Sequence, residues 1–169
     1  MAGVSDRENK DKAVEWINEV YPDRVLDVGA GIGTYAIMAK KPDQHWTALE
    51  VFYPYVNMFN LRNLYDEVVI SDVRFVDFNK LGRFNLIILA DMLEHMTKAE
   101  AIKVIEEAQA HTDRLLICFP IVHQDQEAGH EGNDFEGHVD HWTVEEMEEQ
   151  LRGETYEKVV GDVLAYFMV

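Results

Sequence analysis

The spacing of apolar residues along the chain alternates between a helical and a strand-like period. Over residues 6–20, Ala13, Trp16 and Ile17 fall on one face at helical spacing, and charged residues occupy the other face. This pattern predicts an amphipathic helix. We expect it to end before Pro22, because the residue that precedes a proline is disfavoured in the α conformation.

Short apolar runs predict buried strands, and "FNLIILA" at residues 84–90 is the clearest of them. A near-continuous apolar run is typical of a central strand that is covered on both faces. Further strands are expected over residues 24–28, 45–50, 68–71 and 114–120, and helices over residues 34–40, 55–63, 98–110 and 143–151. The last of these helices begins with a capping-box pattern, Thr143 with Glu146.

The tail "YEKVVGDVLAYFMV" is interpreted as two strands around a two-residue turn at Gly161 and Asp162. Strands that alternate with helices favour a parallel sheet, which this hairpin would complete in antiparallel fashion. The pattern therefore predicts an α/β fold: a seven-stranded, mostly parallel sheet with a C-terminal antiparallel hairpin and helices on both faces.

Composition adds limits on the class of protein. The chain has 169 residues, 47% of them hydrophobic, so we expect one globular domain over residues 1–169. The apolar run at residues 86–90 is too short to cross a bilayer, and the polar start of the chain predicts no signal or transit peptide. The single cysteine, Cys118, fits a reducing compartment. We expect a cytoplasmic protein that does not bind membranes.

The formal net charge of −17 comes from 32 acidic and 15 basic residues. Because binding to duplex nucleic acid needs clustered Lys and Arg, this balance argues against a duplex partner. An acidic field favours cationic or neutral ligands. Most of the acids can equally serve solubility alone, so only acids at the ends of predicted strands carry a functional hypothesis.

The sequence "GAGIG" at residues 29–33 follows the first predicted strand and precedes a helix. Glycine there permits positive φ and lets a ligand lie against the backbone. The dinucleotide-binding pattern G-x-G-x-x-G would need glycine at position 34, where Thr34 stands. Asp27, two residues before the first glycine, would repel a pyrophosphate but attract an ammonium group. The loop therefore favours a cationic ligand over a nicotinamide dinucleotide.

The stretch "VLDVGAGIGT" resembles the first motif of class I S-adenosylmethionine-dependent methyltransferases, an acid followed by G-x-G-x-G. "TALEV" at residues 47–51 is similar to the family's acidic end of the second strand, and "SDV" at residues 71–73 to its adenine-edge motif. "LADMLEHM" at residues 89–96 resembles the fourth-strand motif of the small-molecule branch. The resemblance implies a Rossmann-like fold and S-adenosylmethionine as the cofactor.

The same resemblance implies a role for particular residues. Glu50 would accept hydrogen bonds from both ribose hydroxyls, since a carboxylate offers two acceptor oxygens. Phe52 would cover one adenine face, and Asp72 would accept from the exocyclic amine; alternatively, Phe52 belongs to the core and Asp72 to a turn. The full set of expected cofactor-binding residues is Asp27, Gly29, Ala30, Gly31, Gly33, Thr34, Glu50, Val51, Phe52, Asp72, Val73, Ala90 and Asp91.

Histidines supply the catalytic candidates. His95 follows the fourth strand, where it is either a general base or a histidine at a helix start that a neighbour satisfies. Residues 121–142 form a long segment without periodicity, which we expect to be a lid over the acceptor pocket. It carries His123, His138 and His141 as second-rank candidates, although His141 can equally pack around Trp142.

A metal site in this segment has little support. His138 and His141 stand three residues apart, with Asp125, Asp134 and Asp140 available as ligands. No cysteine pair or H-E-x-x-H motif accompanies them. We expect no metal site.

The predicted function is transfer of a methyl group from S-adenosylmethionine to an oxygen or nitrogen atom of a small-molecule acceptor. "ADML" replaces the N-P-P-Y or D-P-P-Y motif of enzymes that methylate amino groups of DNA bases. Two alternatives stay open: a non-catalytic S-adenosylmethionine-binding or partner subunit, and a nicotinamide-dependent oxidoreductase. The sequence leaves the oligomeric state open, a homodimer included.

Overall fold

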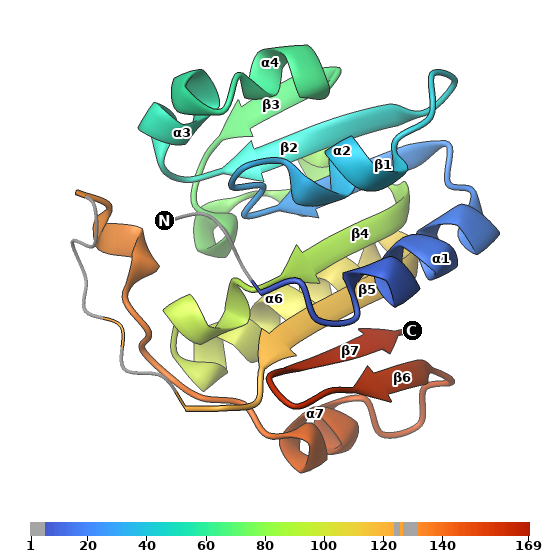
Figure 1. Ribbon diagram of the computed structural model, residues 1–169, viewed down its shortest axis with the longest axis vertical. Coiled ribbons are helices and arrows are strands. Elements are labelled where there is room, and N and C mark those ends of the chain that lie inside the picture. The colour runs from blue at the N-terminus through green and yellow to red at the C-terminus, as the bar shows by residue number, and fades with distance from the viewer. Residues whose placement is uncertain (1–5, 124–125, 127–131) are drawn as a thin grey trace.

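The computed structural model describes residues 6–123, 126 and 132–169, which form a seven-stranded sheet of order β3-β2-β1-β4-β5-β7-β6 (Figure 1). β7 pairs antiparallel with β5 and β6, and the other pairings are parallel. The strands are β1 (Arg24–Val28), β2 (His45–Glu50), β3 (Glu67–Ile70), β4 (Phe84–Ala90), β5 (Thr112–Pro120), β6 (Glu157–Val160) and β7 (Leu164–Met168). The predicted α/β fold class is confirmed.

Helices cover both faces of the sheet. On one face lie α1 (Lys10–Val20), α2 (Thr34–Ala39), α3 (Tyr53–Met58) and α4 (Leu61–Leu64), and on the other α5 (Phe78–Leu81), α6 (Lys98–Ala110) and α7 (Val144–Gln150). Short 3-10 turns are η1 (Val73–Phe75), η2 (Leu93–His95) and η3 (Asp134–Glu136). No helix among the described residues is long and apolar enough to span a membrane.

The two helical layers create two hydrophobic cores, one on each face of the sheet. In β4, Ile87 and Leu89 belong to the core under α6, whereas Leu86 and Ile88 belong to the core under α1 and α2. Successive side chains of a strand point to opposite faces. A strand that is buried on both sides therefore needs the unbroken apolar run from which β4 is predicted.

The helix predicted over residues 55–63 is split into α3 and α4. Asn60 adopts a left-handed conformation with φ of 53°, which ends one helix and precedes the next. Asparagine tolerates this conformation better than most residues because its short side chain bonds to the local backbone. The capping box predicted at Thr143 and Glu146 is present at the start of α7.

The C-terminal hairpin has three residues between its strands, Gly161 to Val163, rather than two. The carboxylate of Glu8 accepts hydrogen bonds from the N–H groups of residues 162, 163 and 164, at 2.7–2.8 Å. A Cβ on Gly161 would lie 2.2 Å from the Glu8 carboxyl carbon. A contact with the start of the chain therefore shapes this turn, and local turn preferences could not predict its length.

The parallel strands all end at the same edge of the sheet, on the left in Figure 1. Strand order reverses at β1, which lies between β2 and β4. In open α/β sheets, ligands bind outside the carboxyl ends of the strands at this reversal. The loops after β1, β2, β3 and β4 converge there.

Candidate functional site

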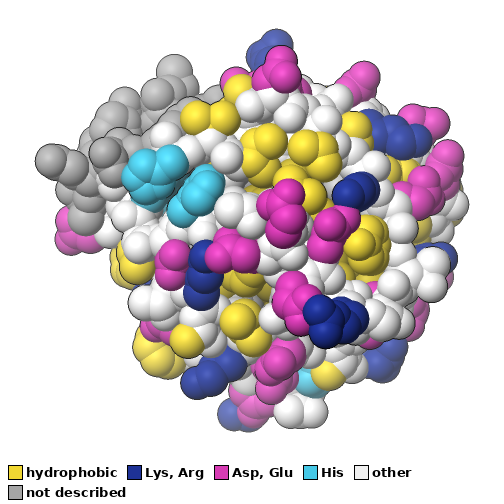
Figure 2. Space-filling model, turned by 90° about the horizontal axis from the view of Figure 1, so that it is seen from below, with side chains coloured by type: hydrophobic (Ala, Val, Ile, Leu, Met, Phe, Trp, Pro, Cys, Tyr) yellow, Lys and Arg dark blue, Asp and Glu magenta, His cyan; other side chains and the backbone are white. Residues whose placement is uncertain are grey.

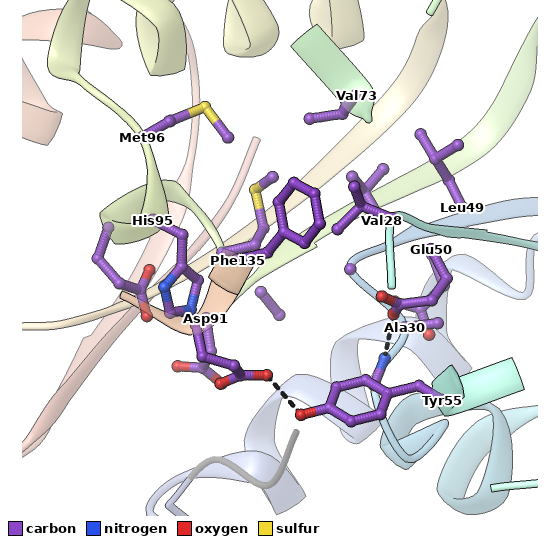
Figure 3. Close-up of a pocket in the computed structure, with 18 of the residues that line it drawn as sticks. Val28, Ala30, Leu49, Glu50, Tyr55, Val73, Asp91, His95, Met96 and Phe135 are labelled. Atoms are coloured by element: carbon purple, nitrogen blue, oxygen red, sulfur yellow. Dashed lines mark hydrogen bonds between the residues drawn. The ribbon is translucent and has the colours of Figure 1, made fainter. Parts of the chain in front are cut away.

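A cavity of about 350 Å³ lies at this edge. Loops after β1 to β4 form its floor, and residues 132–142, which we call the roof segment, supply Asn133, Phe135, Glu136 and His138 to its lining. Figure 3 shows Glu50 and Tyr55 on one side of the cavity and His95 on the other, with Phe135 between them in this view. The volume falls in the range of small-molecule pockets.

The glycine loop places its backbone against this cavity. Gly29, Gly31 and Gly33 all have positive φ, of 68°, 52° and 78°. The Gly29 N–H donates to the Leu49 carbonyl at 2.8 Å, which ties the loop to β2. At Gly33, which is not among the residues lining the cavity, a Cβ would lie 2.8 Å from the nearest Leu64 side-chain atom. The third glycine thus serves backbone conformation and helix packing.

Glu50 connects the end of β2 to the glycine loop. Its Oε2 accepts from the Gly31 N–H at 3.0 Å and its Oε1 from the Phe52 N–H at 2.9 Å, and the residue is 4% exposed. Burial raises the pKa of the Glu50 carboxyl, and the backbone hydrogen bonds oppose that rise. Each carboxylate oxygen retains a second acceptor site. Glu50 can therefore hold the loop and still accept two hydrogen bonds from a ligand.

Asp27 lies in the floor of the cavity and is buried. The Tyr65 hydroxyl donates to its Oδ2 at 2.5 Å. Burial raises the pKa of the Asp27 carboxyl from 3.8 to about 7, the Tyr65 hydrogen bond lowers it, Glu50 raises it further and Lys10 lowers it. A buried acid of this kind favours a nearby positive charge, because a cation stabilises its ionised form.

Asp72 is paired with Arg74, a residue that the sequence did not single out. The Arg74 guanidinium donates to both carboxylate oxygens, with an Nη2–Oδ2 distance of 2.6 Å, and also reaches Glu100 at 3.3 Å. Burial opposes ionisation of Asp72, but the Arg74 hydrogen bonds outweigh it and lower the pKa of the carboxyl. Both residues line the cavity.

Tyr55, rather than Phe52, faces the cavity. The Phe52 ring packs edge-on against Tyr55, with centroids 4.9 Å apart, and Phe52 is not among the lining residues. The Tyr55 hydroxyl donates to Glu136 Oε1 at 2.9 Å (Figure 3). This bond joins the loop after β2 to the roof segment.

Asp91, at the end of β4, has a left-handed backbone with φ of 50°. Its carboxylate lies 3.6 Å from Lys10 Nζ, and the Cys118 thiol donates to Oδ1 at 3.4 Å. Lys10 is only 4% exposed and does not itself line the cavity, so the first helix places a buried cation behind Asp91, which does. The sequence pattern gave no sign of Lys10, because its partner Asp91 lies 81 positions away.

The histidine candidates separate into two pairs. His95 and His138 line the cavity with ring centroids 5.2 Å apart, whereas His123 and His141 pack against each other at 5.5 Å and are not among the lining residues. His95 Nδ1 lies 3.2 Å from the Gly137 carbonyl oxygen. Burial lowers the pKa of His95, which favours the neutral ring at pH 7.

Glu94 also lines the cavity, and the sequence pattern did not single it out. It is 4% exposed, and its Oε2 has no hydrogen-bond partner among the described residues. Burial, reinforced by the nearby charge of Asp91, raises the pKa of the Glu94 carboxyl well above its ordinary value. The Glu94 carbonyl accepts from the N–H groups of Val139 and Asp140, at 2.8 and 3.2 Å, so it also anchors the roof segment.

Charge is mixed on the face of the molecule seen from below in Figure 2, where acidic, basic and apolar side chains alternate and two histidines lie together. On this face the basic side chains do not gather into one patch.

No protein-family model and no curated protein sequence matches the chain. Solved structures do match it. The N-terminal domain of EvdMO1, crystallised in the presence of S-adenosylhomocysteine and D-fucose, aligns with a TM-score of 0.72 and 16% identity over 97% of this chain and 82% of that one. Magnesium protoporphyrin IX methyltransferase (ChlM) from Synechocystis PCC 6803, with bound S-adenosylhomocysteine, has a TM-score of 0.65 and 14% identity, covering 94% and 80%. The fold is that of the class I methyltransferases.

An O-methyltransferase family protein from Burkholderia thailandensis has the same class I methyltransferase fold, with a TM-score of 0.66 and 15% identity over 94% of this chain. This chain covers only 55% of that one.

Within this class I methyltransferase fold, the expected cofactor residues gather at one cavity, and all of them except Gly33 and Phe52 line it. Of the metal ligands weighed from sequence, His138 lies beside His95 and not in a group with His141. Asp125, and with it part of the predicted lid over residues 121–142, lies outside the described residues.

Proposed function

We propose that the protein is a methyltransferase that uses S-adenosylmethionine to methylate an oxygen or nitrogen atom of a small-molecule acceptor. The observation that carries the proposal is Glu50, a buried carboxylate at the end of β2 that is hydrogen-bonded to the glycine loop beside the cavity. Supporting it, fold neighbours were crystallised with S-adenosylmethionine or S-adenosylhomocysteine bound. A reducing, cytoplasmic location remains part of the proposal.

The lining residues fit the cofactor by their chemistry. Glu50 has two remaining acceptor sites for vicinal ribose hydroxyls. Asp27 gains from a neighbouring ammonium group, which would favour its ionised form. The positive-φ glycines let the backbone approach the ligand without side-chain interference. When bound, S-adenosylmethionine supplies a methyl group on a positively charged sulfur.

The protein's own task is to position the acceptor and exclude water. Methyl transfer of this kind needs near-attack geometry more than it needs acid–base help. Met92, Met96 and Phe135 supply apolar surface in the cavity, and His95 and His138 its polar end. We place the reacting atom of the acceptor against these two histidines. His123 and His141 take no part, because they are not among the lining residues.

The decisive experiment is a calorimetric titration of the purified chain with S-adenosylmethionine, S-adenosylhomocysteine and NAD. We expect both sulfur ligands to bind with one site per chain and NAD to fail. Turnover is then measured by mass spectrometry with methyl-deuterated S-adenosylmethionine and a panel of hydroxyl- and amine-bearing small molecules. A labelled product supports the enzyme.

Two results would overturn the proposal. NAD binding without binding of either sulfur ligand would favour the nicotinamide-dependent oxidoreductase. Binding of S-adenosylmethionine with no labelled product from any acceptor would favour a non-catalytic binding subunit.

A further inference from the structure

Three side chains with metal-ligating atoms converge at the polar end of the cavity. One ligand atom each from Glu94, His95 and His138 lies within 4.8 Å of the other two. Among the described residues, this is the one group of three or more such side chains with that spacing. All three line the cavity.

The three residues come from two segments that the backbone fixes together. Glu94 and His95 belong to η2, and His138 belongs to the roof segment. The two hydrogen bonds from Val139 and Asp140 to the Glu94 carbonyl hold the roof segment against this turn. The Lys98 N–H also donates to Asp140 Oδ2 at 3.1 Å. His138 is thus held at the cluster by its neighbours in sequence.

His95 retains one ring nitrogen that can bind a metal ion. A carbonyl oxygen can only accept a hydrogen bond, so the contact with Gly137 places the ring proton on Nδ1. Nε2 then keeps a free lone pair. Metal-ligating histidines characteristically donate their other ring N–H to a backbone carbonyl or a carboxylate in this way, which fixes the tautomer and the ring orientation.

Glu94 contributes an independent observation. Its Oε2 is buried without a hydrogen-bond partner among the described residues. Burying a polar atom without a hydrogen-bond partner destabilises the fold, and more so when the atom is charged. A cation at the cluster would satisfy this oxygen and balance the carboxylate charge.

We propose that Glu94, His95 and His138 bind a divalent transition-metal ion. Two imidazoles with one carboxylate suit Zn²⁺, Mn²⁺ or Fe²⁺, whereas Mg²⁺ and Ca²⁺ prefer oxygen ligands alone. Three protein ligands leave coordination positions open, as in catalytic rather than structural sites. This assignment departs from the expectation, based on sequence, that the chain has no metal site.

The metal site also indicates the chemical class of the methyl acceptor, an inference that rests on the proposed function. The open coordination positions would face the cavity and bind an oxygen atom of the acceptor. The acceptor class is then a small molecule with a hydroxyl or carboxylate oxygen, held by two such oxygens where they are adjacent. The metal would orient the acceptor without assigning His95 to proton transfer.

The test begins with the full chain stripped of metal by a chelator and dialysed. Titration with Zn²⁺ by calorimetry is expected to give one site per chain, and Co²⁺ is expected to give visible absorption bands of a nitrogen- and oxygen-ligated ion. Mg²⁺ is expected to bind at least about 10-fold more weakly than Zn²⁺. Failure of Zn²⁺, Mn²⁺ and Co²⁺ to bind would overturn the inference.

Variants locate the ion. Glu94→Gln keeps the size of a buried side chain, and His138→Ala changes a half-buried residue; each is expected to weaken Zn²⁺ binding by at least about 10-fold. His141→Ala is the matched control, because His141 also packs against another histidine but does not line the cavity. Zn²⁺ affinity that falls in His141→Ala, or that survives in both other variants, would overturn the assignment.

Two further measurements separate this inference from the proposed function. S-adenosylhomocysteine is titrated into metal-free and Zn²⁺-loaded protein. Binding of S-adenosylhomocysteine without binding of Zn²⁺ overturns the metal site alone. Binding of Zn²⁺ without binding of S-adenosylhomocysteine overturns the methyltransferase alone. Acetohydroxamate, a bidentate oxygen ligand, is then added to the Co²⁺ protein. A changed absorption spectrum supports open positions that face the cavity, and an unchanged spectrum overturns them.

Discussion

The two sides of the cavity are built on different principles. On the glycine-loop side, the carboxylates of Glu50 and Asp72 are held by groups within a few residues of strand ends, such as the Phe52 N–H and Arg74. On the roof side, Glu94 and His95 depend on residues 137–140, more than 40 positions later in the chain. One side is organised by strand geometry and the other by a long-range contact.

This difference decides how each side responds to change. The glycine-loop side is continuous with the hydrophobic core through β1 and β2, so its geometry should be as stable as the sheet. The roof side is held by few hydrogen bonds to a segment outside the sheet, which places it among the less stable parts of the fold. For the proposed methyl transfer, which needs two substrates, the more stable side would bind the cofactor and the less stable side could adapt to the acceptor.

The largest expected effect tests the burial of charge on the glycine-loop side. The pKa of Asp27 is about 7 in the folded protein and 3.8 ordinarily, with Tyr65, Glu50 and Lys10 as the groups that face it. The folded state therefore binds the Asp27 proton more tightly than the unfolded state does. The contribution of this proton to the free energy of unfolding is complete at low pH and is lost as the pH rises through 7. Between pH 5 and 8 the expected loss is about 3 kcal/mol.

Asp27→Asn removes the titrating carboxyl, and with it the pH-dependent contribution to the free energy of unfolding, while its amide oxygen can still accept the hydrogen bond from Tyr65. The variant is expected to lose less stability than the wild type between pH 5 and 8 in urea unfolding. If the free energy of unfolding changes with pH in the same way in both proteins, burial does not raise the pKa of Asp27. The contrast between the two sides of the cavity would then weaken.

The next effect tests the packing of the glycine loop. Gly33→Ala combines a positive φ with a Cβ 2.8 Å from a Leu64 side-chain atom, and it is expected to destabilise the fold by about 2–3 kcal/mol. Gly153→Ala is the control, because φ is +95° but nothing lies within 4 Å of the added Cβ. Its expected cost is about 1–2 kcal/mol. Equal losses of unfolding free energy would mean that helix packing plays no part at Gly33.

A third effect tests the ligand-binding role of Glu50. Glu50→Ala is expected to weaken S-adenosylhomocysteine binding by about 2 kcal/mol, or about 30-fold, through lost hydrogen bonds to a charged group. Glu67→Ala, which removes an exposed acid from β3, is the control for a change in net charge. Calorimetry that finds the two variants equal would remove Glu50 from the site.

The smallest effect concerns the bond that joins the two sides. Tyr55→Phe deletes the hydrogen bond to Glu136 and keeps the aromatic contacts with Phe52 and Phe59. Glu136 keeps Asn133 and Gln126 as partners, so the expected loss is about 1 kcal/mol. Hydrogen exchange should quicken in the roof segment and stay unchanged in β1 and β2. Faster exchange on both sides would show that they open together.

The glycine-loop side could be predicted from the sequence because its signals are local. The bounds of β1, β2, β4 and α6 follow from the hydrophobic period, and Glu50 and Asp72 follow from their places at or just after the end of a strand. The partners Lys10, Arg74, Tyr65 and Glu136 could not be predicted. Each meets its carboxylate or hydroxyl through tertiary packing or side-chain conformation, for which a one-dimensional pattern carries no signal.

Less of the roof side could be predicted from the sequence. The segment over residues 121–142 has no periodicity, so the sequence indicated only that it was a loop with histidines. Nothing in the spacing distinguished His138, beside the cavity, from His141, three residues later. The N–H groups of Val139 and Asp140 place His138 beside the cavity by donating hydrogen bonds to the Glu94 carbonyl. Because any residue type can form such backbone bonds, the sequence does not indicate them.

Glu8, which closes the C-terminal hairpin, has a consequence for how the protein is made. Asp6 from one end of the described chain and Val163 and Leu164 from the other line the same cavity, and the Glu8 contact with residue 164 spans 156 positions. During synthesis, residue 8 must wait until residue 164, which is 156 positions later, has been added before this wall can form. A ligand that fills the cavity would then stabilise the contact between these two distant segments.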